Sequence, residues 1–390
     1  MALMQTYTRW SIEPVKAEGA RIWDRDGREY LDFAAGIGVV NVGHCHPHVV
    51  ARVEKQLHTL WHVSNLFPIQ AQEALAQRLT EASGLGAAFF CNSGAEANEA
   101  AIKLARKAAH EQKGIVCPEI ISFTQSFHGR TLATLTATGQ DKVKDGFAPL
   151  PDGFVTAPWG DLQALKEAVT PSTAAVMLEV VQGEGGVRPA EGDWLRAVAE
   201  LCREQDLLLM IDEVQTGIGR TGTLFAHEQF GIQPDVMTLA KGLGNGFPVG
   251  CLLATETVAA HLTPGSHGST FGGNPLAIVA GLAVLDILQG AGFLDSVQNK
   301  GTLLKEELYK QIGSSPLVRE IRGLGLMVGI ALHEAQVAQL IPKIQQHGLI
   351  VLPAGTDVIR LLPPLTVSEG EINQAVQILA DVLVNETDEG

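Results

Sequence analysis

Short apolar segments alternate with amphipathic segments through the middle of the chain. Between several of the apolar runs lie stretches such as DWLRAVAELCREQ (193–205), in which the apolar positions recur at helical spacing. Six apolar runs have the length and composition of buried strands: residues 87–91, 115–123, 174–181, 207–212, 236–240 and 249–254. This alternation predicts an α/β fold with a mostly parallel central sheet and helices on both of its faces.

The two ends of the chain follow another pattern. ARIWDRDGREYLDF (20–33) has a turn between two β-rich runs and predicts a hairpin. After residue 276 the chain is mainly helical and ends with short strand-like runs. We expect residues 51–275 to form a large domain, and residues 1–50 and 276–390 to form one smaller α+β domain together. The apolar run 276–285 is too short to span a bilayer and predicts a buried helix.

Composition narrows the class of protein. Of the 390 residues, 46% are hydrophobic and 18% are charged, as in a well-packed globular protein. The net charge of −15 argues against a nucleic acid or an anionic membrane as partner, so an anionic ligand needs a local basic site. Five cysteines without a CxxC pair favour buried thiols in a reducing compartment, and the N-terminus lacks a secretory pattern. We therefore expect a cytoplasmic protein.

A carboxylate and an amine stand at the ends of two predicted strands. LLLMID brings Asp212 to the end of a buried strand, where a charged carboxylate is costly without a cation. TLAKGLGNGFPVG (238–250) places Lys241 after the next strand, among apolar residues and glycines. A solvated surface lysine is the alternative, but burial would lower its pKa and suit it to Schiff-base chemistry. One βα unit separates the two residues, which predicts neighbouring strand ends at the edge where ligands bind.

A third feature lies between a strand and a helix, in CNSGAEANEAAIKLARKAA (91–109). Ser93 and Glu96 fit a capping box, and Gly94 lets the backbone approach a ligand closely. The amides of the first helical turn can then hold a phosphate, although an ordinary capped helix fits as well. A phosphate cradle, a lysine and a buried aspartate together predict pyridoxal 5'-phosphate, whose ring nitrogen needs an acidic partner.

The histidine-rich run GHCHPH (43–48) is a possible metal site. Alternate histidines with Pro47 among them do not give ligand pairs at helical spacing, and no second cluster of histidine or cysteine lies nearby. We therefore predict no metal site.

Nearly the whole chain resembles the class III pyridoxal-phosphate-dependent aminotransferases. The blocks that carry the resemblance occur in the family's order: NSGAEANEAAIKLAR, SFHGRT, VVQGEGGV, IDEVQTGIGRTG, AKGLGNGFPVG and HGSTFGGNPLA. The resemblance implies the aspartate-aminotransferase-like fold (fold type I) and a homodimer with its active sites at the subunit interface.

The resemblance also assigns cofactor-binding residues. It implies that Lys241 carries the cofactor and moves the substrate proton, and that Asp212 pairs with the ring nitrogen. Gln215 is expected at the ring hydroxyl, with Phe127 and Val214 on the two ring faces. The residues expected around the phosphate are Ser93, Gly94, Ala95 and, from the partner subunit, Thr270.

Substrate-binding residues follow in the same way. Arg130 is implied as the clamp for a distal substrate carboxylate, although such an arginine alone would suggest a surface ion pair. Arg360 is expected to bind a second carboxylate and Glu184 to pair with it reversibly, in a loop whose glycines would permit movement. Ser269 is expected to reach the substrate from the partner subunit.

The expected donor is the δ-amino group of N2-acetyl-L-ornithine and the expected acceptor is 2-oxoglutarate. The products would be N-acetyl-L-glutamate 5-semialdehyde and L-glutamate, in a step of arginine biosynthesis. Ornithine, 4-aminobutyrate, succinylornithine and succinyldiaminopimelate stay open as donors. Ile37 favours the first donor, because the family's ornithine enzymes tend to carry tyrosine there. Two rival functions also stay open: an aminomutase of the same fold, and a cofactor-binding protein without catalytic activity.

Overall fold

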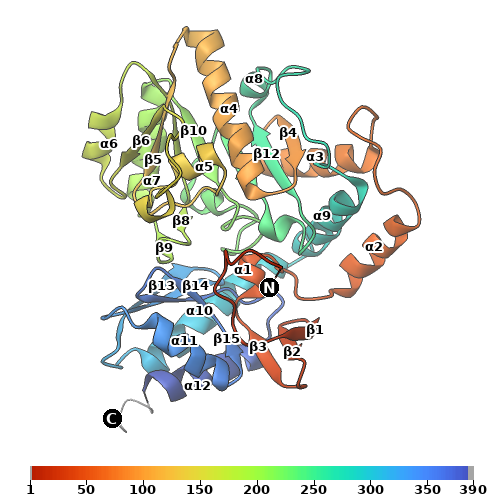
Figure 1. Cartoon of the computed structure of the whole chain (residues 1–390), viewed down its shortest axis with the longest axis vertical. Helices are drawn as coiled ribbons and strands as arrows, with labels where there is room; N and C mark the ends of the chain where they lie inside the picture. Colours follow the sequence, from red (N-terminus) through yellow and green to blue (C-terminus); the bar gives the residue numbers. More distant parts are fainter. Residues whose placement is uncertain (1, 385–390) are drawn as a thin grey trace.

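A seven-stranded sheet forms the upper half of the molecule in the computed structural model, which describes residues 2–384 (Figure 1). Its strands, in spatial order, are β4 (Ala87–Cys91), β12 (Gly250–Ala254), β11 (Val236–Leu239), β10 (Leu208–Asp212), β7 (Thr173–Leu178), β5 (Glu119–Phe123) and β6 (Phe154–Ala157). Strand β12 runs antiparallel to both of its neighbours, and the other paired strands are parallel. The predicted mostly parallel sheet is confirmed.

The strand boundaries differ from the prediction at particular points. Strand β5 begins only at Glu119, because Pro118 lacks the amide proton that the sheet would use. Strand β6 was not predicted: it is short, only partly buried and lies at the sheet edge. Between β10 and β11 the chain forms a short 3-10 helix, η2 (Ala226–Phe230), in place of the expected α-helix.

Alternate side chains of the central strands face two different layers of helices. Ile120 and Met210 pack beneath the helix that follows β4, with its alanine-rich face. Ile121 and Ile211 pack on the opposite side, against Trp194 and its neighbours. This alternation buries both faces of the sheet, as predicted.

Twelve α-helices and two further 3-10 helices surround the sheets in the described residues. Their bounds are α1 (Ala35–Gly38), α2 (Pro47–Leu57), α3 (Gln70–Ser83), α4 (Gly94–Lys113), α5 (Leu132–Ala137), η1 (Asp141–Val143), α6 (Leu162–Ala168), α7 (Gly192–Glu204), η3 (Lys241–Leu243), α8 (Glu256–Ala259), α9 (Pro275–Leu288), α10 (Phe293–Ile312), α11 (Val337–Gln346) and α12 (Glu369–Leu383).

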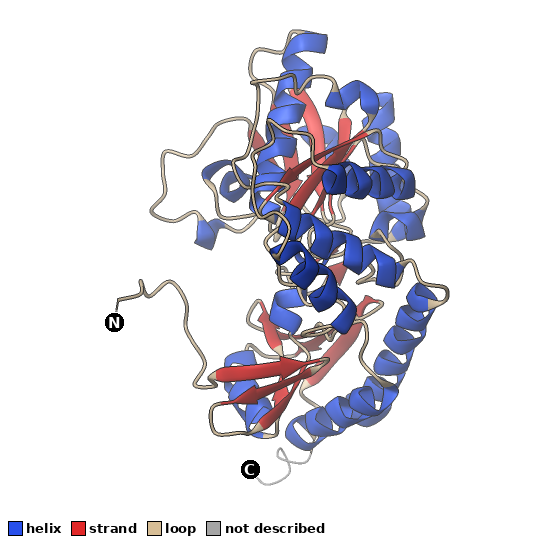
Figure 2. Cartoon of the chain, turned by 90° about the vertical axis from the view of Figure 1, so that its right-hand side faces the viewer, coloured by secondary structure: helices blue, strands red, loops and turns tan. Residues whose placement is uncertain are grey.

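Residues from both chain ends meet in the lower half of the molecule. One sheet has the order β1 (Pro14–Glu18), β2 (Arg21–Asp24), β3 (Glu29–Asp32) and β15 (Leu349–Ile350), and a second has β13 (Val318–Leu324), β14 (Met327–Leu332), β17 (Val358–Leu361) and β16 (Leu352–Ala354). Strands β2 and β3 form the predicted hairpin, and β15 joins β3 in parallel. Figure 2 shows the strands of the two halves one above the other, and the segment before β1 extending away from the lower group. The division at residues 50 and 275 stays a prediction.

Helix α9 is the buried helix that the apolar run predicted. Its side chains lie in a core that also contains residues of α3, α10 and β11. No single described helix is long and apolar enough to cross a membrane; α9 and α10 pass that test only as a pair, bent by 74°. The cysteines only partly match expectation, because Cys91, Cys202 and Cys251 are buried while Cys45 and Cys117 are exposed.

Candidate active site

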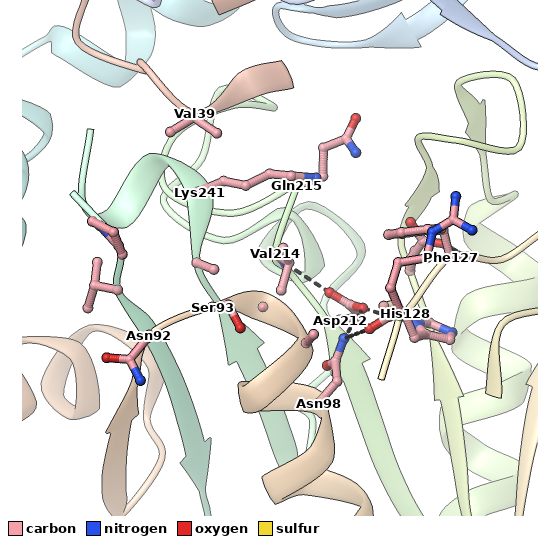
Figure 3. A pocket seen from close by; sticks show the side chains of 18 of the residues that line it. Val39, Asn92, Ser93, Asn98, Phe127, His128, Asp212, Val214, Gln215 and Lys241 are labelled. Atoms are coloured by element: carbon pink, nitrogen blue, oxygen red, sulfur yellow. Dashed lines mark hydrogen bonds and ion pairs between the residues drawn. The ribbon is translucent and has the colours of Figure 1, made fainter. Parts of the chain in front are cut away.

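A cavity of about 380 Å³ opens beyond the ends of β10 and β11. Strand register sets Asp212 opposite Thr238, three residues before Lys241, so both predicted residues reach the same cavity. Of the cofactor residues expected from the sequence, those that line it are Ser93, Gly94, Ala95, Phe127, Asp212, Val214, Gln215 and Lys241. Figure 3 shows the labelled members of this set around one space.

The carboxylate of Asp212 is held by three donors. Oδ2 accepts hydrogen bonds from Nδ2 of Asn98 at 2.7 Å and from Nδ1 of His128 at 2.8 Å, and Oδ1 accepts the amide of Val214 at 3.0 Å (Figure 3). Asn98 is fixed in turn by the hydroxyl of Thr238, which donates to its Oδ1 at 2.7 Å. The network orients the carboxylate of a residue that is 4% exposed. An oriented, buried carboxylate suits a cationic ring nitrogen.

Lys241 begins η3 directly after β11 and has a left-handed backbone, with φ of +42°. Lysine rarely adopts this conformation, and such strain is typical of residues whose position matters for function. Burial lowers the pKa of its amine below the usual lysine range; the nearby Arg360 acts in the same direction, while Glu184 and Asp212 oppose the shift. A larger fraction of the amine is therefore neutral and nucleophilic.

Helix α4 presents its N-terminus to the cavity. The Ser93 hydroxyl accepts the amide of Glu96 at 3.2 Å, which leaves the amides of Gly94 and Ala95 for a ligand. A Cβ on Gly94 would lie 2.7 Å from a methyl of Val214, so only glycine fits this close packing. The predicted capping box is only half formed, because the Glu96 carboxylate accepts the amide of Asn92 and not that of Ser93. The N-terminus of α4 therefore places backbone donors at the cavity, where they favour an anion such as a phosphate.

Phe127 and Arg130 lie on the segment between β5 and α5. The Phe127 amide donates to Oε2 of Glu179 at 3.0 Å, which fixes the position of the ring in the cavity. The guanidinium carbon of Arg130 lies 5.4 Å from the centre of the Phe127 ring. Arg130 is exposed and has no ion-pair partner among residues 2–384, so the surface ion pair that the lone arginine would suggest is not seen.

A second cationic site adjoins the cavity through Gln215. Arg360, on β17, is 2% exposed, and its Nη1 donates to Oε1 of Glu184 at 2.6 Å and to Oε1 of Gln215 at 3.0 Å. Burial opposes ionisation of Glu184, but Arg360 and Lys241 outweigh it and lower the pKa of that carboxyl. The predicted Glu184–Arg360 pair is therefore present. Gln215 faces this pair as well as the expected ring position.

Ser269 and Thr270 do not line the cavity of their own chain. The Ser269 hydroxyl accepts Nδ2 of Asn92 at 3.2 Å and the amide of Gly272 at 2.9 Å. Thr270 is exposed. Their expected contribution to the partner subunit's site stays a prediction.

The cavity residues missed from the sequence include Val39, Asn98, His128 and Glu179. His128 and Asn98 stand inside quoted motifs, yet their contacts with Asp212 join segments far apart in the chain. Glu179 follows β7 directly, and this strand-end position was the one signal available for it. Ile37, expected near the entry, is 45% exposed and lines a groove at the N-terminal segment, and Val39 takes the place at the cavity.

The histidine-rich run contributes to folding contacts. His44 pairs with Asp32 at 2.7 Å, His48 pairs with Asp286 at 3.0 Å, and His46 accepts the amide of His48 at the start of α2. Within the part of the chain that the structure describes, no group of three or more His, Cys, Asp or Glu side chains could hold a metal ion.

Comparison with known proteins places this arrangement in a family. A family model described as aminotransferase class III matches residues 3–383. The chain belongs to the class III aminotransferases. An acetylornithine aminotransferase of Bacillus subtilis (strain 168) is 53% identical over 385 residues, which cover 98% of each chain. An acetylornithine aminotransferase of Streptococcus mutans serotype c is 51% identical, over 97% of this chain and 98% of that protein.

Solved structures agree with the family. The ornithine aminotransferase from Toxoplasma gondii ME49 matches with a TM-score of 0.96 at 32% identity, over 100% of this chain and 94% of that chain. The N-acetylornithine aminotransferase from Stenotrophomonas maltophilia K279a matches with a TM-score of 0.85 at 37% identity, over 98% of each chain. The predicted aspartate-aminotransferase-like fold is confirmed, and this chain is a pyridoxal-phosphate-dependent transaminase.

The residues of this class III aminotransferase fit the cofactor. Gly94 packs so closely against Val214 that a Cβ would clash with it, and Gly94 and Ala95 at the start of α4 line the cavity. Among the described residues, the carboxylate of Asp212 has His128 as its ion-pair partner and no lysine or arginine. An anionic phosphate would complement the free amides at the N-terminus of α4. A cationic ring nitrogen would complement the carboxylate of Asp212.

Proposed function

We propose that this class III aminotransferase is an acetylornithine aminotransferase. It transfers the δ-amino group of N2-acetyl-L-ornithine to 2-oxoglutarate and forms N-acetyl-L-glutamate 5-semialdehyde and L-glutamate, in arginine biosynthesis. The observation that carries the proposal is the Glu184–Arg360 ion pair beside the cavity that contains Lys241. The relatives from Bacillus subtilis and Streptococcus mutans, named for this activity, support the same donor.

The ion pair matters because the two substrates differ in charge near the reacting carbon. Acetylornithine has one carboxylate, far from its δ-amine, whereas glutamate has a second carboxylate on the reacting carbon itself. Arg130 can bind the distal carboxylate of both, and Arg360 the proximal carboxylate of glutamate. An unpaired Arg360 beside the uncharged δ-carbon would be unfavourable in a dry site. Glu184 neutralises it in the first half-reaction and releases it in the second.

The remaining site residues support transamination. Bound pyridoxal phosphate supplies a conjugated ring that accepts electrons from the substrate carbon. Asp212 would stabilise positive charge on the ring nitrogen, and Gln215 would contact the ring hydroxyl. Lys241, whose amine has a lowered pKa, would remove and return the proton at the reacting carbon. Phe127 and Val214 would contact the two faces of the ring.

We also propose a homodimer in the cytoplasm. Thr270 would bind the phosphate held by Ser93, Gly94 and Ala95 of the partner subunit, and Ser269 would reach its substrate. The exposure of Thr270 supports this assignment, because the threonine is free to meet another chain. The free cysteines support a reducing compartment.

A donor panel tests the proposed substrate. The purified enzyme is incubated with 2-oxoglutarate and with acetylornithine, ornithine, 4-aminobutyrate, succinylornithine or succinyldiaminopimelate, and glutamate formation is measured. We expect the highest kcat/KM with acetylornithine. Ornithine is the second candidate, because the Toxoplasma gondii ornithine enzyme has such a similar structure. An aminomutase would form no glutamate with any donor.

Glu184→Ala tests the role of the ion pair. Because the variant leaves Arg360 open, we expect the glutamate half-reaction to accelerate and the acetylornithine half-reaction to slow, each by roughly tenfold. Single-turnover measurements follow each half-reaction separately. Glu200→Ala is the matched control, since Glu200 forms an exposed ion pair with Arg203 on α7, away from the active-site cavity. Equal slowing of both half-reactions would assign Glu184 a structural role only.

A further inference from the structure

Glu184 lies between two cavities. Its carboxylate contacts Arg360 on the side of the active site, and the residue also lines a second cavity of about 470 Å³. The second cavity is polar and rich in cations; those that line it are Lys142, Arg188, Arg319 and Arg322. If Glu184 leaves Arg360, this cavity is the space next to it.

The backbone around Glu184 is tightly packed. A Cβ on Gly183 would lie 2.4 Å from Oε1 of Gln215, and one on Gly185 would lie 2.6 Å from the carbonyl oxygen of Gln125. Nη2 of Arg322 also donates to the carbonyl of Gly186 at 2.8 Å. These glycines allow close packing of the backbone in this structure. Rotation of the Glu184 side chain is the movement away from Arg360 that leaves this packing intact.

The rotated carboxylate needs a new cation, since only 30% of the Glu184 side chain is exposed where it now lies. Arg319 already pairs with Asp357 at 2.9 Å, and Arg322 pairs with Glu320 at 2.6 Å. Lys142 is exposed and well solvated. Arg188 is half-buried, and its guanidinium has no hydrogen-bond or ion-pair partner among residues 2–384.

Arg188 is also close in the fold. It begins β9 (Arg188–Pro189), which pairs with β8 (Val181–Gln182), and the turn between these two strands contains Glu184. Its Cγ lies 3.9 Å from the position of a Cβ on Gly186, within the same turn. Both side chains line the same cavity.

We propose that Arg188 receives the carboxylate of Glu184 when a dicarboxylate substrate occupies Arg360. Arg188 is then a specificity-determining residue. It stabilises the state in which Glu184 has left Arg360, and so favours glutamate and 2-oxoglutarate without contacting either substrate. The proposal rests on the proposed function, because it requires Glu184 to alternate between two positions.

Single-turnover measurements on Arg188→Met test the proposal. We expect the glutamate half-reaction to slow by roughly tenfold, as for the loss of a charge-assisted hydrogen bond, while the acetylornithine half-reaction is unchanged. Arg188→Lys, which keeps the charge, should recover part of the loss. Lys142→Met removes a cation from the same cavity and should leave both half-reactions at wild-type rates.

A second background separates the switch from other roles of Arg188. In Glu184→Ala enzyme there is no carboxylate to receive, so adding Arg188→Met should change neither half-reaction. A tenfold effect that persists there would overturn the proposal, because Arg188 would then act on the substrate directly. Equal slowing of both half-reactions would overturn it too. Failure of the proposed function would be seen separately, as wild-type enzyme that forms no glutamate from acetylornithine.

Discussion

Asp212 and Lys241, at neighbouring strand ends, meet opposite surroundings. Asp212 accepts hydrogen bonds from Asn98 and His128, whereas burial lowers the pKa of the Lys241 amine. Both types of environment could be inferred from the sequence, since a buried strand end and a run of glycines are local features. The donors themselves could not, because Asn98 and His128 come from other segments.

Asp212→Asn should keep the fold, because an amide can retain several of these hydrogen bonds, but it cannot hold a positive charge on the ring nitrogen. A pair of charges about 4 Å apart at an effective dielectric near 20 is worth roughly 4 kcal/mol. We therefore expect turnover to fall by about a thousandfold. Steady-state kinetics with saturating cofactor measure this. Near-normal turnover would show that Asp212 does not face the ring.

Glu179 gives a prediction about pH. Burial raises the pKa of its carboxyl to about 7, although the nearby His128 acts in the opposite direction. A carboxyl with a raised folded-state pKa costs no stability below its model value of 4.5; its cost grows as the pH rises from there to about 7 and is constant above that pH. Glu179→Gln removes that cost, on the order of 3 kcal/mol.

The free energy of unfolding in urea at pH 5 and pH 8 measures the effect. We expect Glu179→Gln to gain more stability relative to wild type at pH 8 than at pH 5. Glu204→Gln, at the exposed end of α7, is the control for removal of a carboxylate. A difference between Glu179→Gln and wild type that does not depend on pH would show that Glu179 is ionised throughout.

At the scale of elements, the sequence predicted the buried strands better than it predicted the edge strand or the direction of each strand. The six apolar runs all contain strands of the large sheet, because buried parallel strands need continuous apolar residues. Strand β6 was not predicted, because an edge strand has fewer apolar positions. The antiparallel direction of β12 was also hidden, since a short apolar run has the same pattern in either direction.

The side chain of Arg220 connects several elements through hydrogen bonds that no sequence pattern predicts. The side chain is fully buried, and among the described residues it has no carboxylate partner. Nη1 donates to the carbonyls of Leu326 at 3.1 Å and Pro363 at 2.6 Å, and Nη2 donates to Oδ1 of Asn41 at 2.7 Å. One guanidinium therefore links the loop after Asp212 to three segments from both chain ends.

Arg220→Met should leave these three acceptors without a donor. At about 1–3 kcal/mol for each buried unsatisfied group, we expect a loss of at least roughly 3 kcal/mol in the free energy of unfolding. Urea unfolding measures it. Arg203→Met is the matched control, because Arg203 forms an exposed ion pair with Glu200 on α7, for which about 1 kcal/mol or less is expected. Equal losses in the two variants would show that the Arg220 contacts contribute little.

At the scale of the whole molecule, the site draws on segments from Val39 to Arg360. The position of Asp212 and Lys241 could be predicted from the sequence, because parallel strands bring their carboxyl ends to one edge of the sheet. Arg360 and Glu184 required the family resemblance, since neither stands at the end of a strand of the large sheet. The structure of one chain does not include its partner subunit. The proposed contribution of Ser269 and Thr270 to the partner's site therefore stays a prediction.

Subunit mixing tests that contribution. Lys241→Ala subunits lack the catalytic amine, and subunits with Ser269→Ala and Thr270→Ala lack the residues assigned to the partner's site, so each homodimer should be inactive. In a heterodimer, one of the two sites has Lys241 from one subunit and both hydroxyls from the other. Because a two-fold dimer has two equivalent sites and one of them is complete in a heterodimer, isolated heterodimers should have roughly half of wild-type activity. They are isolated with two different affinity tags and assayed for glutamate formation. Isolated heterodimers without activity would place Ser269 and Thr270 in the site of their own chain, where the contact of Ser269 with Asn92 would then be the relevant one.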